Sequence, residues 1–236
     1  MPALAASLPL AGLPLRFRAG LAAALAAGFA YLLLSPLMDG AANVALKGSG
    51  VALLAVSALQ IRADGARWLA AILALGALGD VLLELPGQFM TGAASFAAGH
   101  ALAIVFYARH RRAARTGAST GASTGNWLVA ALLLLYGLAM PPLITPAGMI
   151  FLPAMAYAVL LTGMTAALWL SRFPRLAVLG ALAFVLSDTI LVLRMGGGRL
   201  LGPDADGALV WILYFGGQWL ITLGVGRGLL ARAARI

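Results

Sequence analysis

Five ionisable side chains interrupt the long apolar runs of this sequence: Lys47, Asp80, Glu84, His100 and Asp188. Charged groups inside membrane-length apolar segments are costly, and they are retained mainly where they serve a function or pair with one another. Asp80 and Asp188 are the strongest candidates, because an aspartate side chain is too short to reach the end of the segment from either position. We therefore expect these two carboxyl groups to form the centre of a site.

The spacing of the carboxyl groups suggests acid–base chemistry. Asp80 and Glu84 are four residues apart, so on a helix they share one face about one turn apart. Two such carboxylates in a low dielectric repel each other, so one of them is expected to hold a proton at neutral pH. One site can then present both an acid and a base. Asp80 and Asp188 are the expected acid–base pair, suited to protonating one atom while activating water.

The remaining polar residues of the apolar runs have two interpretations each. Glu84 fits a solvated helix end as well as a site, and Lys47 fits a side chain that extends to the membrane surface. His100 fits a packing histidine as well as a site residue. Hydroxyl and amide groups are also tolerated as interhelical hydrogen bonds. We predict a supporting or substrate-binding role for six residues: Lys47, Glu84, His100, Ser187, Tyr214 and Gln218.

Other chemistries have weaker support. The chain has no cysteine, which excludes disulfides, thiolate metal ligands and cysteine nucleophiles. A zinc site normally needs three or four His, Cys or carboxylate ligands, and one intramembrane histidine beside three carboxylates does not favour a metal. The sequence has no Gly-x-Ser-x-Gly motif, and Ser187 is a weak nucleophile candidate for a Ser–His–acid triad. We expect no metal and no cofactor.

The composition places these residues in a membrane. Of 236 residues, 63% are hydrophobic and only 10% are charged, and the mean hydropathy is +1.00. Ordinary soluble domains carry about 25% charged residues. The net charge of +9 alone would suit a nucleic-acid binder, but the basic residues form short clusters between apolar runs instead of one face. We expect membrane lipids, and not nucleic acid, as the surroundings; oligomeric state has no sequence signal.

Eight apolar segments are each close to the ~20 residues that a helix needs to cross a bilayer. They lack the alternation of barrel strands, so the predicted fold is an all-α membrane bundle of about eight transmembrane helices in a single domain, 1–236. Pro141 and Pro142 are expected to end or bend the fifth segment early. The predicted segments are 19–38, 44–61, 67–85, 89–108, 127–144, 148–170, 175–195 and 209–230.

The arginines between these segments predict an orientation. Thirteen of them fall in the two terminal segments and the even-numbered loops, including the 109–115 cluster, whereas Arg194 and Arg199 fall on the other side. Positive loops favour the cytoplasm, so both termini are predicted to be cytoplasmic, in the inner membrane of a bacterial cell. Asp80 and Asp188 then lie roughly 7–11 Å inside the outer helix ends, in the outer half of the bilayer.

A short internal similarity suggests two halves. GALGDVLLEL (76–85) resembles FVLSDTILVL (184–193), which aligns Asp80 with Asp188. Two parallel four-helix repeats, 19–108 and 127–230, would follow, with the two aspartates near a pseudo-two-fold axis. The Gly/Ser/Thr-rich tract 116–126 between the halves is typical of a flexible linker.

At these residues the sequence resembles the YhhN-like lysoplasmalogenase family of polytopic membrane hydrolases. The similar stretches are 75–100 (LGALGDVLLELPGQFMTGAASFAAGH), 180–192 (GALAFVLSDTILV) and 214–221 (YFGGQWLI). Lys47 resembles the family's second-span lysine, although Gly48 replaces the usual proline. Phe215 stands where a second tyrosine is expected, so a role for that hydroxyl is not carried over.

The resemblance implies hydrolysis of the vinyl-ether bond of lysoplasmalogens to a fatty aldehyde and glycerophosphoethanolamine or glycerophosphocholine, with a lysophospholipid as partner. Buried acids fit this reaction, which begins with protonation of the β-carbon. Two alternatives stay open. A proton- or ion-coupled transporter or flippase of a lipid-like or small amphipathic substrate can use the same acids with Lys47, and a structural or binding protein needs only interhelical polar pairs.

Overall fold

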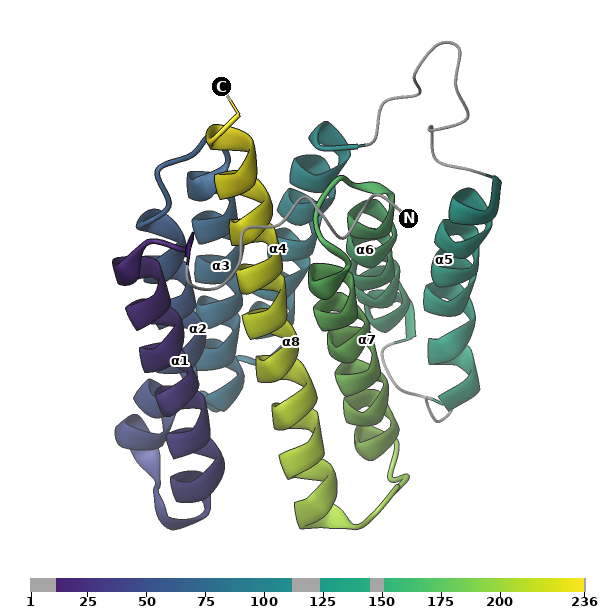
Figure 1. Cartoon of the computed structure of the whole chain (residues 1–236). Helices are drawn as coiled ribbons and strands as arrows, with labels where there is room; N and C mark the ends of the chain where they lie inside the picture. Colours follow the sequence, from purple (N-terminus) through teal and green to yellow (C-terminus); the bar gives the residue numbers. More distant parts are fainter. Residues whose placement is uncertain (1–11, 112–123, 145–150, 236) are drawn as a thin grey trace.

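The computed structural model describes residues 12–111, 124–144 and 151–235 (Figure 1). These residues are helical apart from short connections, and no strand occurs among them. Eight α-helices and one short 3-10 helix make up the described chain. They are α1 (Leu15–Leu34), η2 (Ser35–Leu37), α2 (Gly40–Leu59), α3 (Ala66–Glu84), α4 (Phe89–Arg109), α5 (Thr124–Ile144), α6 (Phe151–Leu170), α7 (Arg175–Met195) and α8 (Pro203–Ala233).

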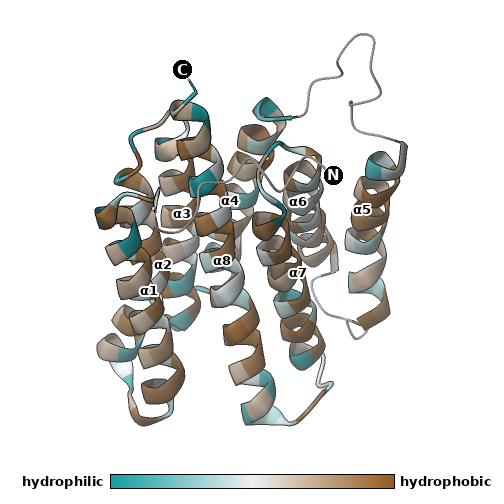
Figure 2. Ribbon diagram, in the orientation of Figure 1, coloured by the Kyte–Doolittle hydropathy of each residue, from teal (hydrophilic) through white to brown (hydrophobic). Residues whose placement is uncertain are grey.

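Every α-helix is long and apolar enough to cross a membrane. Apolar residues cover most of the helix surfaces, and hydrophilic residues concentrate toward the ends of the bundle (Figure 2). Large side chains such as Phe29, Leu135 and Leu179 point outward and are 57–60% exposed. A bilayer accommodates such a surface, whereas water does not. The predicted fold of eight transmembrane helices is therefore confirmed, and the chain is an integral membrane protein.

Several helices begin or end up to six residues from the predicted bounds; α1 and α2, for example, each begin four residues early, and the differences in α8 and α5 involve prolines. The last helix begins at Pro203 instead of 209, because Pro203 occupies the first turn and two aspartates follow it there, a typical helix start. Helix α5 continues through Pro141 and Pro142 to Ile144, so the prolines do not end it early. It also begins at Thr124, inside the predicted linker 116–126, of which residues 116–123 lie outside the described part of the chain.

Helices that are adjacent in the sequence pack against each other within α1–α4 and within α5–α8. Contacts of α4 with α6, and of α8 with α1, α2 and α3, join these groups. Helix α8 (yellow) runs past α1 on one side and α7 on the other, and α5 stands at the edge of the bundle (Figure 1). The division into two repeats stays a prediction.

Glycines allow α7 and α8 to approach closely. A Cβ atom on Gly180 would lie 2.5 Å from the carbonyl oxygen of Gly217, and one on Gly224 would lie 2.6 Å from the backbone nitrogen of Ala177. Such contacts leave no room for side chains, as is common where transmembrane helices pack through small residues. This close packing fixes the position of α8 relative to Asp188 on α7.

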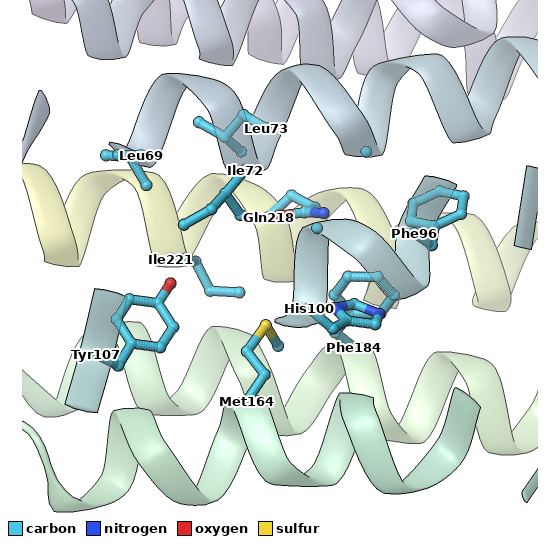
Figure 3. Close-up of a pocket in the computed structure, with 12 residues that line it drawn as sticks. Leu69, Ile72, Leu73, Phe96, His100, Tyr107, Met164, Phe184, Gln218 and Ile221 are labelled. Atoms are coloured by element: carbon cyan, nitrogen blue, oxygen red, sulfur yellow. The ribbon is translucent and has the colours of Figure 1, made fainter. Parts of the chain in front are cut away.

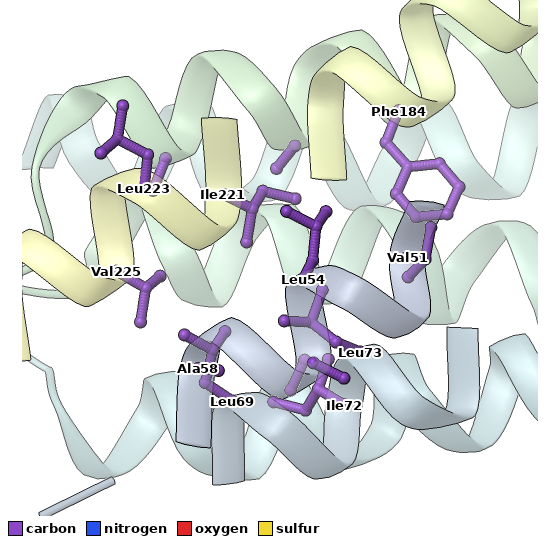
Figure 4. Packing of buried hydrophobic residues seen from close by; sticks show 14 of the residues in the cluster. Val51, Leu54, Ala58, Leu69, Ile72, Leu73, Phe184, Ile221, Leu223 and Val225 are labelled. Carbon is purple, nitrogen blue, oxygen red and sulfur yellow. The ribbon is translucent and has the colours of Figure 1, made fainter. Parts of the chain in front are cut away.

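The apolar core fills the half of the bundle that contains the C-terminal end of α8. Leu54, Leu69, Phe184 and Val225 are each at most 2% exposed and come from four different helices (Figure 4). At the same end, the guanidinium of Arg109 lies 4.5 Å from the ring centre of Trp68. Such arginine–tryptophan pairs are typical of a membrane interface. The opposite half of the bundle contains a large cavity.

Candidate functional site

A cavity of about 1160 Å³ occupies the end of the bundle opposite the C-terminus. All eight α-helices contribute to its lining, and residues near helix ends such as Ser35, Phe89, Met195 and Pro203 form its rim. Small-molecule sites usually enclose about 300–1000 Å³, so this cavity is large enough for a lipid-sized ligand. Its walls are largely apolar, with leucine, methionine, proline and aromatic side chains.

Asp80 lies at the inner end of this cavity. Its side chain projects from α3 and is 1% exposed. The hydroxyl of Tyr214, on α8, donates a hydrogen bond to Asp80 Oδ2 at 2.7 Å. Asp80 Oδ1 has no hydrogen-bond partner among the described residues. One carboxyl oxygen is thus fixed by a tyrosine, and the other remains available to a ligand or to water.

Asp188 has a matching arrangement on α7. The hydroxyl of Tyr157, on α6, donates to Asp188 Oδ2 at 2.7 Å, and the carboxyl group lines the same cavity. Nε2 of His100 lies 3.4 Å from the Tyr157 hydroxyl. Within the described chain, Asp188 Oδ1 again has no partner. The two aspartates predicted from the sequence therefore face one cavity, each with one oxygen bonded to a tyrosine.

Tyr157 is a residue that the sequence interpretation missed. It lies within an apolar run and has no charge, so it gave no signal of its own. Its only indication was the rule that a buried tyrosine hydroxyl usually finds a partner. The polar partner nearest to it in the fold is Asp188.

Aromatic rings pack between the two aspartate–tyrosine pairs. The ring of Phe184 lies 5.0 Å from that of Tyr214 and 5.3 Å from that of His100, centre to centre. Phe96 lies 5.7 Å from Tyr214 in an edge-to-face arrangement. These rings form the inner end of the cavity, next to the two carboxyl groups.

Lys47 and Glu84 form an ion pair on the cavity wall, joining α2 to α3. Asn43 Nδ2 lies 3.4 Å from Glu84 Oε2, and the hydroxyl of Tyr31 lies 3.5 Å from Glu84 Oε1. The lysine and glutamate side chains are 17% and 24% exposed, so the pair is partly shielded from solvent. Glu84 therefore pairs directly with the ammonium group of Lys47. It also lies one helical turn from Asp80 on α3.

Three predicted supporting residues do not direct a free polar group into the cavity: Ser187, Gln218 and His100. Ser187 lines the cavity, but its hydroxyl donates to the carbonyl oxygen of Val210 at 2.9 Å. Gln218 and His100 are not in the cavity lining; they border a space of about 10 Å³ behind it, together with Tyr107 (Figure 3). This volume suits about one water molecule. Gln218 and His100 therefore lie behind the aromatic rings, outside the lining of the cavity that contains the two aspartates.

Phe215 has a packing function in place of the second tyrosine hydroxyl. Its ring fits against Gly28 on α1 and Gly50 on α2, where added Cβ atoms would lie 2.2 and 2.8 Å from it. It also stacks on Trp211 at 5.5 Å. A hydroxyl at this position would point into helix packing and away from the two aspartates.

The site suits proton transfer next to an apolar chain. It has two carboxyl groups with free oxygens, two tyrosines that orient them, and walls that accept hydrocarbon. Within residues 12–111, 124–144 and 151–235, no three His, Asp or Glu side chains converge in a way that could hold a metal ion.

Comparison with protein families gives a match over most of the chain. The sequence pattern of the YhhN family matches residues 42–225, which include every aspartate, tyrosine and lysine of the site except Tyr31 on α1. No curated protein and no solved structure matches the chain.

Proposed function

The chain belongs to the YhhN family, and on this premise we propose that it hydrolyses the vinyl-ether bond of lysoplasmalogens. The products are a fatty aldehyde and glycerophosphoethanolamine or glycerophosphocholine. The observation that supports this most is the pair of tyrosine-bonded aspartates at the inner end of a lipid-sized cavity. The family fits such a hydrolase, and the geometry supplies the acid, the base and the apolar slot that the reaction needs.

The first step is proton transfer to carbon. One aspartate, as the carboxylic acid, donates its proton to the β-carbon of the vinyl ether, and the C=C π electrons form the new C–H bond. The ether oxygen then shares its lone pair with the α-carbon, which gives an oxocarbenium ion. The resulting carboxylate stabilises this cation electrostatically in a cavity whose walls are largely apolar. Glycosidases, with two carboxyl groups and an oxocarbenium-like transition state, offer an analogy.

Water then completes the reaction. It adds to the α-carbon while the second aspartate, as carboxylate, takes one of its protons, and a hemiacetal forms. The hemiacetal collapses when the second aspartate returns that proton to the glycerol oxygen and the first aspartate takes the hydroxyl proton. The C–O bond breaks, aldehyde and alcohol leave, and both carboxyl groups regain their starting protonation.

The two tyrosines act as positioning residues. Tyr157 and Tyr214 each hold one oxygen of an aspartate, so the second oxygen of each carboxyl group is directed to the ligand. Proton transfer to carbon requires close alignment, and a fixed carboxyl group loses less entropy on reaching it. Lys47 and Glu84 add a neutral pair nearby, which maintains charge balance around Asp80.

Asp80 and Asp188 lie about 6 and 10 Å from the ends of their helices on the cavity side. With cytoplasmic termini, as the arginine distribution predicts, this places the reaction in the outer half of the bilayer. A lysophospholipid from the outer leaflet would then reach the cavity without crossing the membrane.

A transporter of an amphipathic substrate is the competing function, because an intramembrane Lys–Glu pair in a cavity also suits ion coupling. The experiment that separates the two is aldehyde release from a lysoplasmalogen by the purified protein in detergent micelles. A hydrolase needs no second compartment, so we expect the purified protein to release aldehyde in micelles, where no gradient exists. Absence of aldehyde from well-folded protein, together with uptake in proteoliposomes, would contradict the hydrolase proposal.

A further inference from the structure

The rim of the cavity carries two charged side chains that the proposed reaction does not use: Arg194 at the end of α7 and Asp204 in the first turn of α8. We propose that they form a subsite for a zwitterionic headgroup, in which Arg194 binds the phosphate and Asp204 the ammonium group. This inference rests on the proposed function and names the residues that hold the headgroup of its substrate.

Arg194 is held in place with most of its donors free. Its Nη2 donates to the carbonyl oxygen of Pro203 at 3.3 Å, and the backbone of Gly207 lies behind the guanidinium. Arg194 forms no ion pair with any described residue. The nearby Asp206 is occupied, since it accepts hydrogen bonds from the backbone nitrogens of Leu200 and Leu201. A half-buried guanidinium with open donors suits bidentate phosphate binding.

Asp204 complements this cation. It is exposed on the rim, and within the described chain it forms neither an ion pair nor a hydrogen bond through its side chain. Arg194 and Asp204 line the same cavity without pairing with each other. Opposite charges that stay apart at one rim match a ligand whose own phosphate and ammonium groups are separated by a short linker.

The spacing of Asp188 and Arg194 along α7 is similar to the spacing of the vinyl ether and the phosphate in a lysoplasmalogen. Asp188 and Arg194 both line the cavity and are six residues apart on one helix, which corresponds to about 9 Å along its axis. In a lysoplasmalogen, seven bonds separate the vinyl β-carbon from phosphorus, or about 9 Å when extended. An extended lysoplasmalogen is therefore long enough to reach from a phosphate bound at Arg194 to the level of Asp188 in the same cavity.

Ion pairing argues against Lys47 as the phosphate ligand. Its ammonium group is already neutralised by Glu84, and the pair lies on the wall formed by α2 and α3. A phosphate there would compete with a formed, partly shielded ion pair. Arg194 forms no such ion pair with a described carboxylate, and the Asp206 carboxylate that interacts with it electrostatically already accepts hydrogen bonds from the backbone nitrogens of Leu200 and Leu201.

The test uses a ligand that the protein cannot hydrolyse by the proposed route: 1-O-hexadecyl-glycero-3-phosphoethanolamine, whose saturated ether has no double bond to protonate. Its Kd is measured in detergent by calorimetry, beside those of 1-O-hexadecyl-glycero-3-phosphate and of 1-O-hexadecylglycerol. The variants are Arg194→Gln and Asp204→Asn. Arg62→Gln, an exposed arginine between α2 and α3 outside the cavity lining, and Asp39→Asn, at the start of α2, are the matched controls.

We expect Arg194→Gln to weaken both phosphate-containing ligands about tenfold or more, because a charged hydrogen-bond donor is lost. Its affinity for hexadecylglycerol stays unchanged, which also shows that the variant is folded. Asp204→Asn weakens the phosphoethanolamine ligand about threefold, as for an exposed charge pair, and does not weaken the phosphate ligand. The two controls leave all three Kd values unchanged.

Two binding results would overturn the subsite: an unchanged Kd of the phosphate ligands in Arg194→Gln, or an equal loss for all three ligands. Failure of the proposed function gives a different result, since charge-dependent binding would remain while wild-type protein releases no aldehyde from a vinyl ether. Conversely, aldehyde release with a KM that Arg194→Gln does not change would refute the subsite and leave the hydrolase proposal standing.

Discussion

Removing the hydroxyl of Tyr157 should reduce catalysis more than it reduces stability. In Tyr157→Phe, Asp188 loses the 2.7 Å hydrogen bond to Oδ2, while the ring that packs against His100 remains. A hydrogen bond to a charged group contributes about 1.5–3 kcal/mol. If this energy acts fully on the transition state, kcat/KM falls roughly 10- to 150-fold.

A neighbouring tyrosine provides the matched control. Tyr136 on α5 bonds to Oγ1 of Thr189 at 2.8 Å, next in sequence to Asp188, but lies outside the cavity lining. Tyr136→Phe therefore makes the same chemical change without touching a carboxyl group, and we expect kcat/KM within about twofold of wild type, because only a neutral hydrogen bond remote from the reacting atoms is lost.

The assay is aldehyde release from a lysoplasmalogen in detergent, with a thermal unfolding midpoint measured for each variant. Wild-type kcat/KM in Tyr157→Phe would refute the positioning role. Equal losses in the Tyr157 and Tyr136 variants would refute it as well, because they would point to a general effect on the α5–α7 region.

Three further predictions concern the bundle that carries the site. Glu84→Gln should lower the unfolding free energy by about 1–3 kcal/mol by leaving Lys47 unpaired, and adding Lys47→Met should recover most of the loss; additive losses in thermal unfolding would contradict the pairing. Gly180→Ala should destabilise the protein because its Cβ would meet a carbonyl oxygen of α8 at 2.5 Å, whereas Gly216→Ala, with nothing within 4 Å, should not; equal unfolding midpoints would refute this packing. A cysteine at Gly197 in this cysteine-free chain should react with an impermeant maleimide outside intact cells, and reaction only after lysis would reverse the proposed orientation.

The fold was largely predictable because bilayer solvation acts on residue type alone. Helices must satisfy their own backbone in lipid, so runs of about 20 apolar residues identify them. Helix ends depend on more local chemistry. Pro203 starts a helix that hydropathy places later, because its first turn contains two aspartates that hydropathy counts as loop residues.

The sequence indicated the charged residues of the site, because burying a charge is costly, but it did not indicate the uncharged Tyr157. Asp80 and Asp188 were identified because an isolated carboxyl group in an apolar helix demands a reason. Tyr157 carries no such cost and gave no signal. Lys47 and Glu84 were both found, but their pairing depends on how α2 and α3 are rotated against each other, which spacing within one helix does not encode.

Aromatic packing, and not helix rotation, separates Gln218 from the cavity. It lies four residues after Tyr214 on α8, so it shares that helix face, yet it borders the small space behind the aromatic rings. Similarity of residue type and depth was not enough to distinguish a position on the cavity wall from one behind it. That distinction arises from the packing of Phe96 and Phe184, which close the inner end of the cavity.

The central claim is that Asp80 and Asp188 together carry the acid–base chemistry. Its most direct test is aldehyde release from a lysoplasmalogen by purified Asp80→Asn and Asp188→Asn, compared with Asp39→Asn, whose carboxylate lies outside the cavity. The amide keeps the shape of the side chain but transfers no proton, so each site variant should remain folded and lose about 10²- to 10⁴-fold in rate, while the control keeps wild-type activity. Wild-type turnover by both site variants would contradict the carboxylate mechanism.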